Sequence, residues 1–472
     1  MMTFSKRSKI LSCSIGATLF PAVWQAAAAE RPNIVVIMAD DLGWNAVSWH
    51  NRNVKTPNID ARIRQQGVEL DQFYTSPMCS PTRAGFITGR YPIRYGCARA
   101  VIPPWRTFGL PTSEVTLAEA FQKAGYTHRG MFGKWHLGHA RKEWHPCSRG
   151  FTDFTGCLNG AIDYFTLERD GGYDWHRNES PLYVKGYATE LIGDASCEFI
   201  RNAAADDSPF FCYVAFNAPH SPFQVPERYK KMYAQIDDEK KQVYFGMITC
   251  MDDQIGRILD TLDETGAAKD TVVLFFSDNG GVLSIKGNNK PLRGHKLTSY
   301  QGGVRTVACG RFPGRWPAGQ LVSERVAFID LFPTLISLAG ITPEQAGCKP
   351  LDGVDLNDLL CKNVPRLPER SLYFYHGQPG PDEEWYAVIS KDWKLVVSGP
   401  DISSGPSDKD HVELFRISSD AAEKKDVAMA HPEVTEQLMK DLIAFRRLQP
   451  ADAVAPYKDG RAGFVAPKIW GE

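Results

Sequence analysis

The sequence predicts an α/β fold in which a mainly parallel sheet lies between layers of helices. Three continuously apolar runs, at residues 33–38, 210–216 and 271–276, have the composition of strands that are covered on both faces. Helical patterns lie between these runs, and such alternation favours parallel strands joined by helical connections. A chain of 472 residues is long enough for two domains, or for one large domain with an appendage.

Several of the predicted helices have recognisable ends. Thr116 and Glu119 have the spacing of a capping box, and Gly125 is expected to end the helix that starts there. Residues 240–264 have the pattern of a long amphipathic helix, and residues 329–338 predict another. Each of these two helices is followed within two residues by a glycine, which is a common helix stop.

The pattern changes after residue 365. Four short apolar runs separated by turns predict a small antiparallel sheet at residues 372–375, 385–389, 393–397 and 412–417. A helix is expected to follow near residues 432–447. We therefore divide the chain into a signal peptide at 1–29, a main domain at 30–365 and a smaller C-terminal subdomain at 366–472.

The first residues have the pattern of a secretory signal peptide. Lys6, Arg7 and Lys9 form a basic start, an apolar stretch covers residues 10–23, and small residues at 27–29 offer a cleavage site. A membrane anchor is the alternative, but the apolar stretch is short for a span, so we expect no stable membrane insertion. The protein is expected to be exported to a periplasm or secreted, or delivered to a lysosome if its source is an animal.

Charge and cysteine content narrow the range of partners. The formal net charge is −1, so no overall field favours a nucleic-acid partner, and a polyanionic ligand would have to meet local Lys and Arg. The chain has 11 cysteines but no pair with the spacing of a zinc ligand motif. Cys147 and Cys157 are close enough in sequence to pair as a disulfide, and free buried thiols are the equal alternative.

Polar side chains follow the three apolar runs and a shorter predicted strand at residues 126–132, at the point where each strand ends. In open α/β sheets the carboxyl ends of parallel strands meet at one edge, where ligands bind. Carboxylate and amide oxygens at that edge are suited to Ca²⁺ or Mg²⁺, although such residues also occur in ordinary turns. The residues concerned are Asp40 and Asp41, Asp278 and Asn279, Asn217 and His220, and Lys134 and His136.

Cys79 begins the most specific motif in the chain, Cys79-Ser80-Pro81-Thr82-Arg83. Pro81 suits the first turn of a helix, so Cys79 is expected near the positive end of that helix. Helix N-termini are good places for an anionic ligand. The alternative is a cysteine that caps the helix and packs in the interior.

This motif resembles the signature of the type I sulfatases, in which the cysteine is converted to formylglycine. The stretch CSPTRAGFITGR at 79–90 carries the likeness, and GKWHLG at 133–138 resembles the second signature of the same family. The resemblance extends from residue 32 to residue 415 and implies an alkaline-phosphatase-like core. Within the family, residues 41–45, 89–94 and 287–294 look most like arylsulfatase B, an N-acetylgalactosamine-4-sulfatase.

The resemblance also implies roles for individual residues. Calcium would be held by Asp40, Asp41, Asp278, Asn279 and the modified residue 79. Catalytic and sulfate-binding roles would fall to Arg83 and Lys134, which hold the formylglycine and the sulfate, to His136, which orients the formylglycine, and to His220 and Lys296, which face the ester oxygen. Gln301 stands where family members often have Glu, and we expect that position to be structural.

The implied activity is hydrolysis of sulfate esters on a carbohydrate. The expected substrate is a 4-O-sulfated galactose or N-acetylgalactosamine unit of a polysaccharide, or of oligosaccharides derived from it. A hydrated aldehyde at residue 79 would attack sulfur, and its second hydroxyl would allow sulfate to be expelled, which a thiol could not do. The maturation partner would be a formylglycine-generating enzyme. Expected sugar contacts are Asp163 and His295, with Trp44, Trp135 and Tyr164 as further candidates.

Two other functions fit part of the pattern. A phosphodiesterase or phosphonate hydrolase of the same superfamily would be expected to pair the late aspartate with histidine, a ligand for transition metals. The pair here is Asp278 and Asn279, which favours Ca²⁺ and sulfate. A non-catalytic carbohydrate-binding relative would be expected to lack some of the site residues, yet all of them are present.

Overall fold

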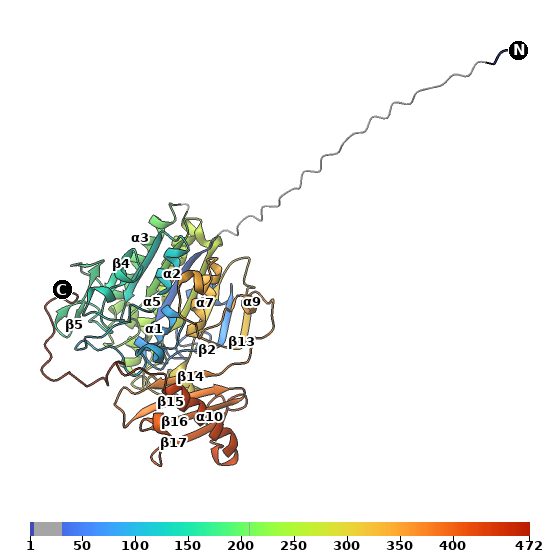
Figure 1. Ribbon diagram of the computed structural model, residues 1–472. Helices are drawn as coiled ribbons and strands as arrows, with labels where there is room; N and C mark the ends of the chain where they lie inside the picture. Colours follow the sequence, from blue (N-terminus) through green and yellow to red (C-terminus); the bar gives the residue numbers. More distant parts are fainter. Residues whose placement is uncertain (4–30, 207) are drawn as a thin grey trace. The chain divides into compact units, whose positions relative to one another are not determined.

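The computed structural model describes residues 1–3, 31–206 and 208–472 (Figure 1). Residues 32–472 form one compact unit. The predicted signal peptide lies almost entirely outside the described residues. Within the described part of the chain, no helix is both long enough and apolar enough to cross a membrane.

A sheet of 11 strands forms the centre of the molecule, and its middle is parallel. Ala39 pairs with Ser277, and Met38 pairs with Ala215, so neighbouring strands end at the same level. The three apolar runs of the sequence form three of these strands. In spatial order the parallel strands are β10 (Thr271–Ser277), β1 (Asn33–Ala39), β9 (Phe210–Ala215), β3 (His128–Lys134) and β4 (Asp153–Cys157).

Antiparallel strands extend the sheet at both edges. Beyond β10 lie β12 (Ala308–Arg311), β2 (Val68–Tyr74) and β11 (Arg305–Thr306), and β13 (Gln320–Ala327) pairs with β2 in parallel. Beyond β4 lie the two-residue strands β7 (His176–Arg177) and β8 (Ser180–Pro181). The predicted α/β class with a mainly parallel central sheet is confirmed, with these antiparallel edges added.

Helices cover both faces of the sheet, which explains why β1 is apolar throughout. Alternate residues of a strand point to opposite faces. Ile34 and Val36 belong to the core that contains side chains of α1 (Cys79–Thr88), α2 (Leu117–Lys123) and α7 (Leu331–Leu338). Val35 and Ile37 belong to the opposite core, with α3 (Ala188–Ala203) and α5 (Glu239–Glu264). Both sets are fully buried.

The predicted helix ends are present. Thr116 and Glu119 form the two reciprocal hydrogen bonds of a capping box at the start of α2. Gly125, Gly266 and Gly340 follow α2, α5 and α7 with φ of 84°, 75° and 75°, the left-handed region that glycine adopts without a steric cost. The shorter elements are α4 (Glu227–Lys231), α6 (Gln301–Val304), α8 (Pro343–Ala346), α9 (Asn357–Leu360), β5 (Glu168–Arg169) and β6 (Gly172–Tyr173).

A separate four-stranded antiparallel sheet follows in the C-terminal part, as predicted (Figure 1). The order along the sheet is the order along the chain, and α10 (Pro432–Arg446) packs against it. The ten cysteines that the structure describes, Cys147 and Cys157 among them, are free thiols. The four strands are β14 (Leu372–His376), β15 (Glu384–Ser390), β16 (Trp393–Gly399) and β17 (His411–Arg416).

After α10 the chain returns to the main domain. The backbone N–H of Val454 donates to the carbonyl of Gly96 at 2.9 Å, and that of Trp470 donates to Tyr173 at 3.0 Å. The Trp470 indole donates to the carbonyl of Arg169 at 3.0 Å. Figure 1 shows the C-terminus beside β5. The tail therefore packs against the main domain as well as following the small sheet.

The small sheet also holds the loop that carries Lys296, residues 281–300, which we call the lysine loop. Arg293 of this loop donates to Glu413 at 3.0 Å, and the N–H of Gln301 donates to Glu423 at 2.7 Å. Glu423 pairs with Lys394 at 2.7 Å, and both side chains are fully buried. His376 contacts the carbonyl of Leu297 through Nε2 at 3.0 Å.

Replacing Lys394 with Met should destabilise the protein strongly, because Glu423 would keep a buried charge without its partner. Removing one member of a buried ion pair typically costs about 3–5 kcal/mol. Urea unfolding measures the change. Lys440→Met removes an exposed lysine of the Glu436 pair on α10 and is the matched control, with an expected loss of less than about 1 kcal/mol. Equal stability of the two variants would contradict the account.

Candidate active site

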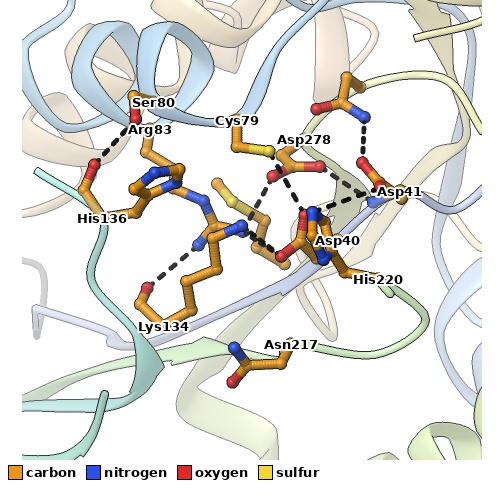
Figure 2. Close-up of polar contacts among 12 residues, drawn as sticks. Asp40, Asp41, Cys79, Ser80, Arg83, Lys134, His136, Asn217, His220 and Asp278 are labelled. Atoms are coloured by element: carbon orange, nitrogen blue, oxygen red, sulfur yellow. Dashed lines mark hydrogen bonds and ion pairs between the residues drawn. The ribbon is translucent and has the colours of Figure 1, made fainter. Parts of the chain in front are cut away.

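The carboxyl ends of the central strands bring polar side chains from distant parts of the chain into one cluster (Figure 2). Asp40 and Asp41 directly follow β1, and Asp278 and Asn279 directly follow β10. Lys134 is the last residue of β3, and His220 lies in the loop after β9. Cys79 is the first residue of α1. The pairing of β1 with both β9 and β10 fixes the level at which these side chains emerge.

The turn after β1 has a special backbone conformation. Asp41 adopts φ of 66°, a left-handed conformation that Asp tolerates better than most residues. Its N–H donates to the Asp278 carboxylate at 3.2 Å, and the next N–H, of Leu42, donates to the Ser277 hydroxyl at 3.1 Å. His136 and Leu297 have φ of 58° and 67°, so three such residues lie in the segments that form the site. Clusters of this kind are typical of functional sites.

Asp40 lies at the centre of the positive charges. Its carboxylate accepts from Lys134 Nζ at 2.5 Å and lies 3.6 Å from Arg83 Nη2. Arg83 donates to Asp278 at 2.9 Å and to the Lys134 carbonyl at 3.1 Å. Burial alone would raise the pKa of Asp40, but the attraction of Lys134, Arg83 and Lys296 outweighs it and lowers the pKa well below its usual range. Asp40 is therefore ionised.

Asp278 has the opposite balance. Burial raises the pKa of Asp278, the neighbouring charge of Asp40 raises it further, and Arg83 and Lys134 only partly offset these effects. Two carboxylates so close together without further positive charge repel each other. The pair would be relieved by a cation between them.

Asp41 contacts the second group of site residues. One carboxylate oxygen, Oδ1, accepts from Lys296 Nζ and from Asn279 Nδ2, both at 2.7 Å. The other, Oδ2, lies 3.6 Å from His220 Nε2. Burial lowers the pKa of His220 to about 4, so the ring is neutral near pH 7 despite the attraction of Asp41 and Asp40. Burial would lower the pKa of Lys296 as well, but Asp41 and its neighbours raise it well above its usual value, which keeps Lys296 charged.

Cys79 lies between the two lysines and the carboxylates. Its Sγ is 3.6 Å from Asp40 and 3.3 Å from Lys296 Nζ, and its exposed fraction is 1%. Burial raises the pKa of the thiol to about 12. At neutral pH the unmodified side chain is therefore a thiol, which is a poor nucleophile. The preceding residue, Met78, is extended and makes no side-chain cap, so the first N–H groups of α1 are free of a side-chain acceptor.

The oxygen atoms of the cluster fit a hard cation. Among the described residues, Asp41 Oδ2 and Asn279 Oδ1 are buried polar atoms without a hydrogen-bond partner. One ligand atom from each of Asp40, Asp41, Cys79 and His220 can lie within 4.8 Å of the others. Carboxylate and amide oxygens are the ligands that Ca²⁺ prefers. A divalent cation would satisfy the unpartnered oxygens and separate Asp40 from Asp278.

His136 lies at the edge of the cluster and belongs to a polar bridge behind Cys79. Its carbonyl accepts from the Ser80 hydroxyl at 3.0 Å, and its Nε2 contacts the Ile102 carbonyl at 3.1 Å. Ser80 Oγ in turn accepts from the Ile102 N–H at 3.1 Å. Burial lowers the pKa of His136 well below its usual value, so the ring is neutral. Its Nδ1 has no partner in the described chain and is free to contact a ligand.

The expected sugar contacts do not join the cluster. Asp163 accepts from the N–H groups of Phe165 and Thr166 and from Gln224, an arrangement that caps a turn. His295 adjoins Lys296 in the lysine loop, where its Nδ1 contacts the Lys296 carbonyl at 2.7 Å.

The aromatic candidates have structural surroundings. Trp135 is buried in the core, and Trp44 stacks on His50 at 4.3 Å between ring centroids. Tyr164 is also buried and donates to the carbonyls of Asn217 at 2.6 Å and of His220 at 2.9 Å. Tyr164 thus positions the His220 loop instead of facing solvent.

Three supporting residues were not singled out from the sequence. Ser80 anchors His136, Ser277 fixes the turn that contains Asp41, and Tyr244 of α5 accepts from the Gly43 N–H and donates to the Asp41 carbonyl at 3.0 Å. The first two lie inside or next to the motifs, which is a usable signal. Tyr244 lies more than 200 residues from Asp41, and nothing in the local pattern of α5 distinguishes it. Gln301 is buried at the start of α6 and touches Glu423, away from the cluster.

Comparison with known proteins identifies the class of enzyme that this fold and site define. The family model described as Sulfatase matches residues 32–341. The chain therefore belongs to the sulfatase family, and it is a type I sulfatase. The prediction of a sulfuric ester hydrolase from the two signatures is confirmed.

Individual relatives extend over nearly the whole chain. Arylsulfatase J of Mus musculus is 32% identical over 89% of this chain and 77% of its own length. N-acetylgalactosamine-6-sulfatase of Mus musculus is 31% identical over 88% of this chain and 85% of its own. Among solved structures, Ps i-CgsB in complex with k-i-k-neocarrahexaose has a TM-score of 0.81 and 27% identity, and the match covers 92% of this chain and 96% of that one.

Adding CaCl₂ should raise the Tm of the protein, and Asp41→Asn should remove most of that rise, because it deletes one ligand charge at an oxygen without a hydrogen-bond partner. A ligand at 100 times its Kd stabilises the folded state by about 2.7 kcal/mol. Thermal unfolding with CaCl₂ and with a chelator measures the difference in Tm.

Asp170→Asn is the matched control. Asp170 also has a positive φ, of 51°, but it lies in the β5–β6 turn. This variant should keep the full calcium response. An Asp41→Asn protein with an undiminished response to Ca²⁺ would show that the cation is held elsewhere.

Proposed function

We propose that this protein is an exported, calcium-dependent carbohydrate sulfatase that acts through formylglycine at residue 79. The observation that carries the proposal is the single buried cluster in which Cys79, Asp40, Asp278, Lys134 and Lys296 meet. The acidic and basic charges of that cluster nearly balance, so a bound dication leaves it positive. An anionic sulfate ester is the ligand that such a site accepts.

Calcium would be held by Asp40, Asp41, Asp278, Asn279 and the modified residue 79. Bound Ca²⁺ supplies positive charge that draws in the sulfate oxygens and stabilises the charge that develops on them. The chain itself contributes Lys134, fixed by Asp40, and Lys296, fixed by Asp41. Lys296 Nζ lies 3.3 Å from Cys79 Sγ, and Lys134 is held by Asp40, which also contacts Cys79. Such preorganised charge is an effective form of transition-state stabilisation.

Conversion of Cys79 to formylglycine would replace a protonated thiol by a group suited to attack. A hydrated aldehyde offers one hydroxyl as nucleophile and a second whose deprotonation allows sulfate to be released. Arg83 and Lys134 hold the carboxylates around residue 79. His136, whose carbonyl accepts from the neighbouring Ser80 hydroxyl, is the residue that we assign to orient the formylglycine. Cys79 has an exposed fraction of only 1%, so a formylglycine-generating enzyme would have to act before the chain has folded.

Departure of the alcohol is assigned to His220 and Lys296. The two side chains contact the two oxygens of Asp41, and so they lie on the same side of the cluster. Lys296 retains its proton and can donate a hydrogen bond to the bridging oxygen. Neutral His220 can donate or accept a hydrogen bond, depending on its tautomer. To act as a general acid, it would first have to become protonated in the complex with substrate.

A galactose-type sulfate is the substrate class that we favour. The relatives include N-acetylgalactosamine-6-sulfatase, and the similar solved structure binds neocarrahexaose. Residues 41–45, 89–94 and 287–294 resemble a 4-sulfatase, so we propose a 4-O-sulfated galactose or N-acetylgalactosamine unit. The 6-sulfatase relatives make the 6-O-sulfate the second candidate. Asp163 and His295 remain proposed contacts to the sugar.

The proposed metal-ligand pair after β10, Asp278 and Asn279, argues against phosphonate or phosphodiester hydrolysis. Asn279 supplies an amide oxygen where a transition-metal site would favour an imidazole. The proposed export rests on the basic, apolar and small-residue pattern of residues 1–29.

A panel of defined esters tests the function. The mature protein should release sulfate from a 4-O-sulfated galactose or N-acetylgalactosamine oligosaccharide faster than from the 6-O isomer. It should hydrolyse matched phosphate and phosphonate esters far more slowly. Ion chromatography of released sulfate measures each rate. Preference for the 6-O isomer would overturn the proposed 4-O position and assign the 6-O-sulfate as substrate. Phosphonate turnover without sulfate turnover would overturn the proposed function.

Two variants and one mass measurement test the catalytic role of residue 79. Cys79→Ala should lose at least about a thousandfold in kcat, the scale of deleting a catalytic nucleophile. Cys361→Ser, a partly exposed cysteine next to α9, should keep its activity. Mass spectrometry of the tryptic peptide at residues 65–83 should find formylglycine in place of cysteine at residue 79. An active protein with an intact cysteine would contradict the mechanism.

A further inference from the structure

A cavity lies beyond the carboxyl ends of β3 and β4, where the C-terminal tail packs against the rest of the chain. Its volume is about 670 Å³, within the range of small-molecule sites. We call it the tail pocket. Residues that line it and carry the argument are Trp105, Arg106, His139, Arg141, His145 and Trp470.

The tail pocket is close to the reaction site along the chain. His139 follows His136 by three residues, so their Cα atoms lie within about 11 Å of each other. Leu158, which also lines the pocket, follows β4 and accepts the N–H of His136 at 3.1 Å. Ile102 contacts the His136 ring, and Pro104, two residues later, lines the pocket. One wall is therefore continuous with the segments that hold His136.

One buried hydrogen-bond donor of the pocket residues lacks an acceptor. Arg106 donates through Nη2 to the carbonyls of Pro456 and Asp459, while its Nε is buried and has no partner in the described chain. His145 is already engaged, because its Nδ1 accepts from the Cys147 N–H at 3.2 Å and its ring also hydrogen-bonds the Asn178 backbone.

The charge of the pocket also favours an anionic ligand. In the part of the chain that the structure describes, Arg106 forms no ion pair. The guanidinium of Arg141 lies 5.1 Å from the Trp144 ring centroid, and its ion pair with Glu143, at 3.5 Å, is exposed and worth little in water. Glu179 is paired with Lys142 at 2.7 Å, and Glu472 is the other acidic residue of the lining. Guanidinium groups bind sulfate and carboxylate oxygens through paired N–H donors.

Aromatic side chains supply the apolar part of the lining. Trp105 is half-buried, with the guanidinium of Arg461 lying 5.1 Å from its ring centroid. The ring of Trp470 packs edge-on against His139 at 5.1 Å. Trp470 is buried and supports the wall, whereas Trp105 is partly exposed. A flat apolar surface beside a fixed donor suits a ligand that has an apolar face and many oxygen acceptors. A sulfated sugar has both features, whereas an apolar small molecule would leave the donor unpaired.

We propose that the tail pocket is a second saccharide site, which binds a distal sulfated unit of the same chain whose sulfate ester enters the reaction site. This inference rests on the proposed function. Binding one polymer at two places raises the effective concentration of the ester at residue 79. The gain exists only for substrates long enough to reach both sites. The tail thus gives a preference for oligosaccharides over single sugars.

A length series of sulfated galactan oligosaccharides, with 4-nitrophenyl sulfate as the small ester, tests this. The mature full-length enzyme should show kcat/KM at least about tenfold higher for a hexasaccharide than for the monosaccharide of the same sulfate position. Arg141→Ala and Arg106→Gln should remove most of that length gain. Glutamine keeps amide donors toward the tail carbonyls while deleting the charge.

Arg201→Ala is the control, because Arg201 is exposed on α3 and its ion pair is the surface contact with Glu264. It should retain the length gain, and Tm values should establish that all variants are folded. Binding of the hexasaccharide and its desulfated form to Cys79→Ala enzyme, by calorimetry, adds a readout without turnover. A sulfate-dependent affinity that Arg106→Gln weakens is the expected result.

The outcomes separate the two proposals. No sulfate release from any substrate by mature enzyme would refute the proposed function itself. Sulfate release with no dependence on substrate length, or with equal losses for short and long substrates in the Arg141 and Arg106 variants, would overturn the tail pocket alone.

Discussion

The whole site depends on the burial of Asp40 in contact with Lys134 and close to Arg83. A buried carboxylate is costly unless it is paired, and here the pairing is made by groups from three different segments of the chain. Asp278 shares the same guanidinium, and its pKa is raised first by burial and then by the neighbouring charge of Asp40. Burying two neighbouring carboxylates does not help to stabilise the fold. A cation that both carboxylates bind explains why they lie together.

The architecture serves this arrangement at two levels. Parallel strands β10, β1, β9 and β3 end together, so their following residues converge without long loops. Cys79 and Arg83 come from α1, and Lys296 comes from a loop without regular structure. That loop is fixed through the Lys296 N–H to Gly281, the Leu297 N–H to Pro77, and the contacts of Arg293 and Leu297 with the C-terminal subdomain. The small sheet therefore contributes to the site by holding the loop that carries Lys296.

Much of the fold and the centre of the site could be predicted from the sequence, because the signals are local. An apolar run followed by Asp-Asp or Asp-Asn indicates both a buried strand and a polar edge, and these runs form β1 and β10. The strand β2 was missed because its residues alternate between buried and partly exposed positions, with charged side chains among them. Lys296 could be assigned only from a family resemblance. Tyr164 is of a residue type that often contacts sugars, but it is buried under the His220 loop. The path of the tail depends on single contacts, such as that of Trp470, and no periodic sequence pattern predicts such contacts.

The central claim is that oxygens from the ends of β1 and β10 hold one cation beside residue 79. A crystal structure of the mature protein grown with CaCl₂, with anomalous scattering data, tests it most directly. The account predicts one strong peak bonded to oxygens of Asp40, Asp41, Asp278 and Asn279, within reach of the residue 79 side chain. A peak at another place, or an ammonium group of Lys134 or Lys296 filling that position while calcium is present, would contradict it.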